Sequence, residues 1–201
     1  CAVVIFGGIA FVVLREGLAK RFRWKKLSMH AKVVLFMSLV LTAAGTVLLK
    51  LTEDITWMGA FFTSVSARTA GFSTFPLGSF SCFLLLTVIV LMVIGASPGS
   101  TGGGIKTTTC YVLFEGIRSS ATNTSEKAFR YAVPTDAFRK AAVITLLAIG
   151  IVLSGTYILV ILEPGVPFLD ALFEMSSAFG TAGLSTGISA GLCDAAKILT
   201  I

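Results

Sequence analysis

A short segment of this sequence occurs twice, and no other feature constrains the fold as strongly. Residues 64–74 read SVSARTAGFST and residues 176–186 read SSAFGTAGLST, so aligning Thr69 with Thr181 gives an offset of 112 residues. Self-similarity on this scale indicates one structural unit used twice. Each copy ends in a strip of small and polar residues, whose backbone groups are tolerated at membrane depth only inside protein or beside water. Such strips are typical of a selectivity filter.

The composition indicates a membrane protein. Of the 201 residues, 55% are hydrophobic and only 13% are charged, and the mean hydropathy is +0.93, values that a soluble domain does not normally reach. The net charge of +6 comes from basic residues that lie between apolar runs. This is typical of membrane topology signals and predicts no nucleic-acid partner. Four cysteines without CxxC spacing predict neither a disulfide framework nor a zinc site.

The first part of the sequence predicts one membrane unit. Residues 1–14 have the character of the last turns of a helix, and the positive-inside rule places the basic loop over 15–32 in the cytoplasm. The apolar run over 33–51 is long enough to span outward, whereas 55–67 is shorter, as in a re-entrant helix. The sequence starts inside one apolar segment and stops as another begins, so we expect a fragment cut at both ends.

Glycine and proline interrupt the returning span. Residues 81–94 are continuously apolar, but the next ten, GASPGSTGGG, cannot continue as regular helix. Glycine costs about 1 kcal/mol per helical position and proline about 3 kcal/mol. A loop at this depth must be shielded by protein or face water. It does not fit a phosphate-binding loop, because Ile105 separates the last glycine from Lys106 and no strand is predicted before it.

The second part of the sequence repeats this order. The connection over 115–140 carries five basic residues and is again predicted to be cytoplasmic. Residues 141–162 span outward, 163–165 turn at the outer surface, and 168–178 re-enter the membrane after Pro167, at its favoured first-turn position. The predicted fold class is an all-α membrane protein, with repeated units of membrane helix, pore helix, filter and membrane helix around a pseudo-symmetric pore.

The two strips offer backbone carbonyls as ligands for a dehydrated cation. The negative end of each short helix dipole would point at the pore, which favours a cation there. Carbonyls replace an ion's water only where successive peptides turn inward, and glycine tolerates the dihedral angles that this requires. Four carbonyls per strip are candidates, with the threonine hydroxyls as further ligands: Thr69, Ala70, Gly71 and Phe72 in the first, and Thr181, Ala182, Gly183 and Leu184 in the second.

In these features the sequence resembles the Trk/Ktr/HKT superfamily of potassium transporters. The resemblance rests on ARTAGF at 67–72, the glycine-rich loop at 95–106 and SAFGTAGL at 177–184, which together cover most of the chain. Pores of this superfamily are built from four membrane-pore-membrane units, and the sequence resembles the third and the fourth. The resemblance implies passive, ion-selective transport of potassium across a plasma membrane, with a channel-like pore.

The resemblance also divides the chain into a helix end, two pore units and a linker. The predicted parts are residues 1–32, the end of a preceding transmembrane helix with its basic loop; 33–114, the third unit, with filter 69–73 and gate loop 95–104; 115–140, the cytoplasmic linker; and 141–201, the fourth unit, with filter 181–185 and truncated before its last helix.

By the same resemblance, the glycine-rich loop lies beneath the filter and acts as an intramembrane gate, with Lys106 near its cytoplasmic mouth. The alternative is a helix hinge without a gating role. The predicted gate residues are Gly95, Ser97, Pro98, Gly99, Gly102, Gly103, Gly104 and Lys106.

Arg68 and Glu174 are the charged residues nearest the strips. Ionisable groups at that depth are by default functional or paired. We predict that both brace the filter backbone from behind, and pairing of Arg68 with Glu174 or Asp170 is one hypothesis for how they do so. The alternative is that each charge reaches the outer water independently.

From the resemblance we expect surrounding membrane lipid, a homodimer and a cytoplasmic nucleotide-binding regulatory subunit, in the inner membrane of a bacterium. No cofactor is predicted, and no enzyme is expected, because no catalytic constellation surrounds the single histidine, His30. Three alternatives stay open: a sodium-permeable member of the same superfamily, a pump or enzyme subunit that binds nucleotide at the glycine-rich loop, and a non-conducting membrane subunit. Gly71 and Gly183 favour potassium over sodium.

Overall fold

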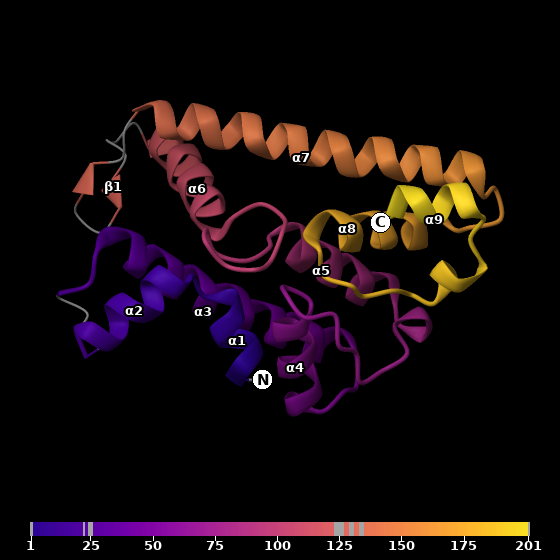
Figure 1. The fold of residues 1–201 in the computed structure, drawn as a ribbon, viewed down its shortest axis with the longest axis horizontal. Helices are drawn as coiled ribbons and strands as arrows, with labels where there is room; N and C mark the ends of the chain where they lie inside the picture. The colour runs from indigo at the N-terminus through magenta and orange to yellow at the C-terminus, as the bar shows by residue number, and fades with distance from the viewer. Residues whose placement is uncertain are drawn as a thin grey trace.

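The computed structural model describes residues 2–21, 23, 26–122, 127–128, 131–132 and 135–200. Outside the described residues lie Cys1 and Ile201, at the two ends of the predicted parts, and the basic residues Lys25 and Arg130 of the two predicted cytoplasmic segments. Helices dominate the described ranges (Figure 1). The α-helices are α1 (Ala2–Gly8), α2 (Phe11–Ala19), α3 (Met29–Thr52), α4 (Trp57–Ser66), α5 (Cys82–Val93), α6 (Thr107–Thr122), α7 (Thr135–Leu162), α8 (Phe168–Gly180) and α9 (Asp194–Thr200), with short 3-10 turns η2 (Leu77–Ser79) and η3 (Ile188–Gly191).

Two of the described helices are long and apolar enough to cross a membrane. They are α3, with 24 residues, and Asp136–Leu162 within α7, with 27 residues. At 1.5 Å per residue they are about 36 and 40 Å long, which exceeds the roughly 30 Å of a bilayer's hydrocarbon core. The Ser28 side chain caps α3 by accepting a hydrogen bond from the Ala31 amide at 3.2 Å, which satisfies an otherwise unpaired amide of the first turn.

Helix α7 exposes large apolar side chains along its length. Leu146, Leu147 and Tyr157 are 70%, 62% and 69% exposed. Contiguous apolar surface of this kind marks contact with an apolar partner or with lipid. Together with the two long apolar helices, it agrees with the membrane protein that the composition predicts.

The predicted interruption separates α5 from α6. Helix α5 ends at Val93 and α6 begins at Thr107, and the loop between them returns to its own starting point, because the Ile105 amide donates to the Val93 carbonyl at 2.8 Å. The loop therefore leaves and re-enters the helical path at nearly one place.

The largest buried cluster surrounds α5. Leu84, Val88 and Met92 on this helix have no exposed surface, and Leu49 of α3 and Phe173 of α8 are buried in the same cluster. Helix α5 packs against both α3 and α8. Because α3 also packs against α4, this core fixes both short helices relative to each other.

The two short helices occupy equivalent places in the repeat. With 10 and 13 residues, α4 and α8 are too short to span a bilayer. The Thr56 side chain caps α4 by accepting a hydrogen bond from the Gly59 amide at 3.2 Å. Pro167 was predicted in the first turn of α8, but it is the N-cap residue, one position before the first helical residue, Phe168. Each helix leads directly into one of the repeated strips.

The two basic segments lie at the same end of the molecule. Figure 1 shows α2, strand β1 (Lys127–Ala128) and the start of α7 together at the left, far from α9. Strand β1 pairs with β2 (Tyr131–Ala132) in an antiparallel ladder of two residue pairs, the only strands among the described residues. This small ladder lies in the linker, and the prediction of an all-α fold class is confirmed.

Candidate ion-conduction site

The two repeated strips meet backbone to backbone. Gly71 and Gly183 both have positive φ angles, of +68° and +77°. A Cβ at Gly71 would clash with the Ala182 carbonyl oxygen and would lie 3.1 Å from the Gly183 Cα. Only glycine satisfies both the dihedral angle and this close approach. Two segments far apart in the sequence therefore form one site.

The amides of both strips point back toward the preceding helices. The amides of Ala70 and Gly71 donate to the Ser66 carbonyl at 3.0 and 3.3 Å, and the Ala182 amide donates to the Ser177 carbonyl at 2.9 Å. Seven of the eight candidate carbonyls accept no hydrogen bond within the described part of the chain. They are those of Thr69, Ala70, Gly71, Thr181, Ala182, Gly183 and Leu184.

The eighth candidate, the Phe72 carbonyl, has a different environment. It accepts a hydrogen bond from the Ser66 hydroxyl at 2.5 Å and is thereby directed back toward α4. The Phe72 carbonyl thus differs from the other seven in having a donor within the protein, and its role as an ion ligand stays a prediction. Ser66 was not predicted from the sequence, because the repeat has Ala178 at the aligned position and the comparison of the two copies selects only shared residues.

The glycine-rich loop lies against both strips. A Cβ at Gly102 would lie 3.2 Å from Cγ2 of Thr69, and a Cβ at Gly103 would lie 2.9 Å from Oγ1 of Thr181. The Gly103 amide donates to that threonine oxygen at 2.7 Å, and Lys106 Nζ donates to the Gly102 carbonyl at 2.6 Å. Three predicted gate residues are thus brought together with the two filter threonines.

The glycines at the two ends of the loop lie in close backbone contact. A Cβ at Gly95 would clash with the Gly103 carbonyl oxygen and would lie 3.1 Å from the Gly104 Cα. Gly104 has φ +73°, which favours glycine. These predicted gate residues close the loop on itself, which is what allows the chain to leave α5 and return at the same point.

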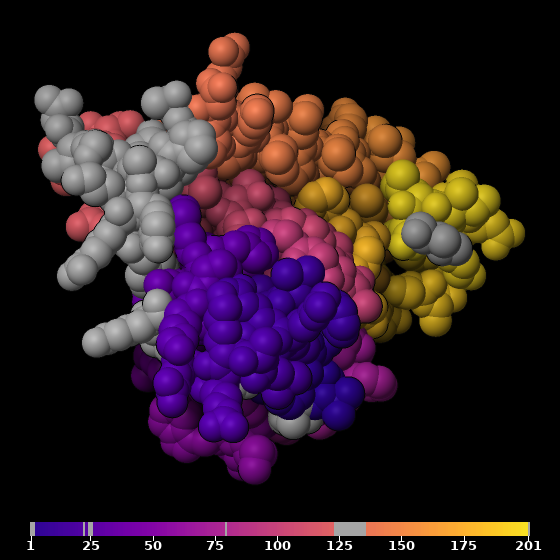
Figure 2. Space-filling view, turned by 60° about the vertical axis from the view of Figure 1, so that its left-hand side comes forward, coloured from indigo at the N-terminus to yellow at the C-terminus, as the bar shows by residue number. Residues whose placement is uncertain are grey.

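The middle of the loop is anchored to the N-terminal helices. Ser97 is fully buried and its amide donates to the Gly8 carbonyl at 3.2 Å. Pro98 and Gly99 form a turn, with Gly99 at φ +79°. Figure 2 shows chain in the pink colour of this region between the indigo N-terminal segment and the yellow C-terminal segment. Ser97 and Gly99 therefore place the middle of the loop against the N-terminal helices.

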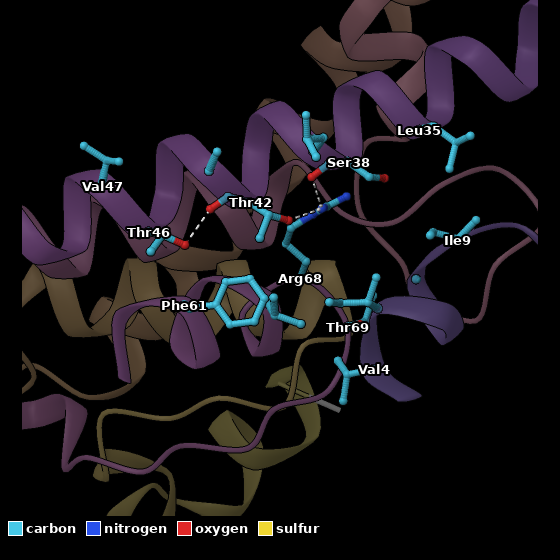
Figure 3. Close-up of a pocket in the computed structure, with 15 residues that line it drawn as sticks. Val4, Ile9, Leu35, Ser38, Thr42, Thr46, Val47, Phe61, Arg68 and Thr69 are labelled. Atoms are coloured by element: carbon cyan, nitrogen blue, oxygen red, sulfur yellow. Dashed lines mark hydrogen bonds between the residues drawn. The ribbon is translucent and has the colours of Figure 1, made fainter. Parts of the chain in front are cut away.

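Arg68 anchors the end of α4 to α3. The side chain is buried, and Nη1 donates to the Ser38 carbonyl and to the Thr42 hydroxyl, both at 3.3 Å, as Figure 3 shows. Arg68 forms no ion pair with any carboxylate of the described residues. The hypothesis that it pairs with Glu174 or Asp170 is wrong, because its side chain faces α3 and those carboxylates belong to α8.

A cavity of about 620 Å³ opens beside Arg68, between α1, α3 and α4 (Figure 3). Its wall is mostly apolar and includes Val4, Val47 and Phe61. The Nε of Arg68 and the hydroxyl of Ser38 have no hydrogen-bond partner within the described residues. The guanidinium is therefore only partly satisfied by α3.

Glu174 holds the segment that follows the second strip. It is 5% exposed, so it does not reach the outer water, and its carboxylate accepts from the Ser185 hydroxyl at 2.6 Å, the Thr186 amide at 3.1 Å and the Ser189 hydroxyl at 2.8 Å. These serines were not predicted as partners. The Ser-Thr pair that ends both strips was an available signal for Ser185, whereas no sequence signal pointed to Ser189.

Two re-entrant helices that end in facing strips, above an interrupted span, define a class of membrane proteins built from repeated pore units. A family model described as TrkH, cation transport protein, matches residues 21–201. The chain belongs to this family.

Individual relatives agree with this assignment. The chain is similar to the Ktr system potassium uptake protein B of Vibrio alginolyticus, at 35% identity over 98% of the chain and 46% of the relative, and to that of Bacillus subtilis, at 33% over 98% and 47%. It is 30% identical to the potassium/sodium uptake protein NtpJ of Enterococcus hirae, over 100% of the chain and 48% of the relative. The chain thus spans about half the length of the curated relatives it matches.

A solved structure shares the fold. The crystal structure of the potassium transporter TrkH from Vibrio parahaemolyticus matches with a TM-score of 0.73 at 19% identity, over 98% of the chain and 46% of that structure. At this identity the likeness establishes the fold, and the predicted architecture of pseudo-symmetric pore units is confirmed.

Proposed function

We propose that this chain contributes two strips of a selectivity filter that conducts potassium ions. The observation that carries the proposal is the pair of touching strips with seven carbonyls that accept no hydrogen bond from the described residues. An unpaired carbonyl away from water is unfavourable. Coordination of a cation that has shed its water gives these oxygens a partner.

Helix dipoles add to this preference for a cation. Helix α4 ends at Ser66 and α8 ends at Gly180, so the negative ends of both dipoles lie beside the strips. The ion would bind in turn to successive carbonyls and move down its electrochemical gradient. The proposal requires no cofactor and no catalytic group, because K⁺ is the cargo and no bond is made or broken.

Potassium is the favoured cargo because the Vibrio alginolyticus and Bacillus subtilis relatives are named as potassium uptake proteins. Gly71 and Gly183 supply the backbone freedom that such a filter needs at both strips. A sodium-permeable pore is the second candidate, since the Enterococcus hirae relative is named for both ions. A nucleotide site in the glycine-rich loop has no comparable support.

The loop over 95–104 would close the ion path on the side of the filter threonines. The support is its position: Gly102 and Gly103 lie against Thr69 and Thr181. A hinge without gating would leave no reason for the loop to bind the filter, whereas the Gly103 amide donates to Thr181. Movement of these glycines away from the threonines would clear the path.

The full-length protein would reside in the inner membrane of a bacterium as a homodimer and would bind a cytoplasmic nucleotide-binding regulatory subunit. The support is the resemblance to the superfamily and the presence of both basic segments at one end of the molecule. A light-scattering mass of two protomers in detergent is the expected measurement for the dimer, and a mass of one protomer would contradict it.

The test of the proposed function is ion flux into liposomes that hold the full-length protein. We expect K⁺ to pass faster than Na⁺, and the preference to be lost in Gly183→Ser, which places a side chain at a positive φ. Gly165→Ser is the control, because nothing lies within 4 Å of a Cβ at that position. Equal K⁺ and Na⁺ flux in the parent would identify the sodium-permeable pore, and no flux of either ion would overturn the proposal.

A further inference from the structure

One peptide group of the loop is held from both sides. Its carbonyl, that of Gly102, accepts from Lys106 Nζ at 2.6 Å, and its amide, that of Gly103, donates to Oγ1 of Thr181 at 2.7 Å. Both distances are at the short end for hydrogen bonds from nitrogen to oxygen. The plane of the Gly102–Gly103 peptide is therefore fixed, with the N–H toward the second strip and the carbonyl toward Lys106.

The two hydrogen bonds strengthen each other. A charged donor on the carbonyl polarises the peptide and makes its amide a better donor on the opposite side. Lys106 forms no ion pair with the carboxylates of the described residues. A potassium ion leaving the filter past Thr181 would therefore meet an N–H dipole and an ammonium group, and both repel it.

The residues on either side of this peptide are suited to a change of its orientation. A peptide plane turns over through ψ of the first residue and φ of the second, and two glycines permit these angles with the least steric conflict. After such a turn the Gly102 carbonyl would face the strip in place of the Gly103 amide. A carbonyl at this position attracts a cation, as the filter carbonyls do.

We propose that the Gly102–Gly103 peptide is the closing element of the gate, and that Lys106 and Thr181 are the positioning residues that hold it closed. Release of the two hydrogen bonds allows the peptide to turn over and to present its carbonyl to the ion. The inference deepens the proposed function and depends on it, since it assumes that potassium passes the strips.

The repeat supplies a matched control for Thr181. Thr69 occupies the aligned position in the first strip, but its hydroxyl makes no hydrogen bond to the described residues, and its Cγ2 is the atom nearest to a Cβ built at Gly8. Thr69→Val and Thr181→Val thus remove the same hydroxyl from one strip each. Only Thr181→Val removes the oxygen that accepts the hydrogen bond from the Gly103 amide of the loop.

The experiment measures resting K⁺ flux in liposomes that hold the full-length protein without any regulatory partner. Lys106→Met and Thr181→Val are each expected to raise resting flux about tenfold, because each removes one charge-assisted or short hydrogen bond from the closed arrangement only. Gly165→Ser, outside the filter and the loop, is expected to match the parent. Lys106→Arg retains a charged donor and should raise resting flux less than Lys106→Met, and Thr69→Val should not raise it. A loss of flux in both threonine variants would instead assign both hydroxyls to ion binding and overturn the inference.

Unchanged resting flux in Lys106→Met and Thr181→Val would also overturn it, as would an equal rise in Thr69→Val. The proposed function fails separately, if the parent carries no K⁺ under any condition. Hydrogen–deuterium exchange over residues 95–106 in detergent tests the inference without transport. Faster exchange in Lys106→Met and Thr181→Val than in the parent and in Thr69→Val supports it, and equal exchange in all four contradicts it.

Discussion

The two repeats share a backbone plan but are held in place by different side chains. In the first, Arg68 at the end of α4 donates to two groups of α3. In the second, Glu174 within α8 accepts from three donors of the segment that follows the strip. At the offset of the repeat, Arg68 aligns with Gly180 and Glu174 aligns with Phe62, so neither repeat carries the charge of the other.

This difference separates what the strips require from what supports them. Both strips have a glycine with positive φ and amides that bind the preceding helix. Their supports differ in sign of charge, in position and in the element that they bind. The common backbone geometry is therefore the part that we assign to ion binding, and the charges are assigned to holding it.

The largest effect is expected from a substitution that breaks the contact between the strips. Gly71→Ala introduces a Cβ that clashes with the Ala182 carbonyl, in addition to the penalty of about 1–2 kcal/mol for a left-handed alanine. Gly183→Ala carries only that penalty, because its nearest neighbour, the Gly71 Cα, is 3.9 Å away. We expect Gly71→Ala to abolish K⁺ flux in liposomes and Gly183→Ala to reduce it.

Gly150→Ala in α7 is the control for both variants. Nothing lies within 4 Å of a Cβ there, and alanine in a helix interior is about 0.5–1 kcal/mol more favourable than glycine. Its flux should match the parent and its melting temperature in detergent should not fall. Flux at the level of the parent in Gly71→Ala would show that the strips do not need to touch.

The next largest effect is expected at Glu174, which supports the second strip as Arg68 supports the first. Glu174→Leu leaves the donors from Ser185, Thr186 and Ser189 without their acceptor, which should destabilise the protein by about 3 kcal/mol or more and lower the ratio of K⁺ to Na⁺ flux. Glu174→Gln keeps one acceptor oxygen and should lose about 1 kcal/mol. Phe62→Leu is the control at the aligned position and should leave the flux ratio unchanged. An unaltered ratio in Glu174→Leu would remove Glu174 from the support of the filter.

A smaller effect is expected at Arg68. Its two hydrogen bonds are 3.3 Å long and it lines a cavity, so methionine has room and Arg68→Met should lower stability by about 1 kcal/mol. Because Arg68 and Glu174 do not pair, the double variant Arg68→Met/Glu174→Gln should be additive within about 0.5 kcal/mol in chemical unfolding. A coupling energy clearly above that value would restore the pairing hypothesis.

The smallest effect concerns a carboxylate outside both repeats. Hydrogen bonds from Lys20 and from Ser28 lower the pKa of Glu16 from 4.5 to about 2. Because the folded value lies below the unfolded one, Glu16 stabilises the fold above pH 4.5, and this contribution is lost as the pH falls toward 2. The melting temperature in detergent should fall over this range by less in Glu16→Gln than in the parent. Identical profiles would show that Glu16 does not tie α2 to the start of α3.

Much of the fold could be predicted from the sequence because a bilayer leaves few choices. The apolar runs predicted the spans now seen as α3 and α7, and their lengths separated these from the short helices α4 and α8. The glycines and Pro98 predicted that the run over 81–94 would break, since such residues do not continue a helix. The repeat predicted which two strips correspond, and the structure brings them into contact.

The side-chain partners could not be predicted, because the position of a residue in the sequence does not tell in which direction its side chain points. Arg68 and Glu174 are each beside a strip in the sequence, yet one faces α3 and the other faces the segment after its own strip. The Ser66 hydroxyl donates a hydrogen bond to the Phe72 carbonyl, six residues later in the sequence, and the second repeat has Ala178 in place of this serine. Such contacts depend on how a helix is rotated about its axis, which the packing around α5 determines.

The most direct test is to locate an ion at the carbonyls of the two strips. A crystal structure of the full-length protein grown in Rb⁺, a heavier substitute for K⁺, would show ion positions by anomalous scattering. We predict Rb⁺ next to the carbonyls of both strips, beside the contact between Gly71 and Gly183. Rb⁺ bound elsewhere, with the carbonyls of both strips paired to protein donors, would contradict the assignment of these strips as a selectivity filter.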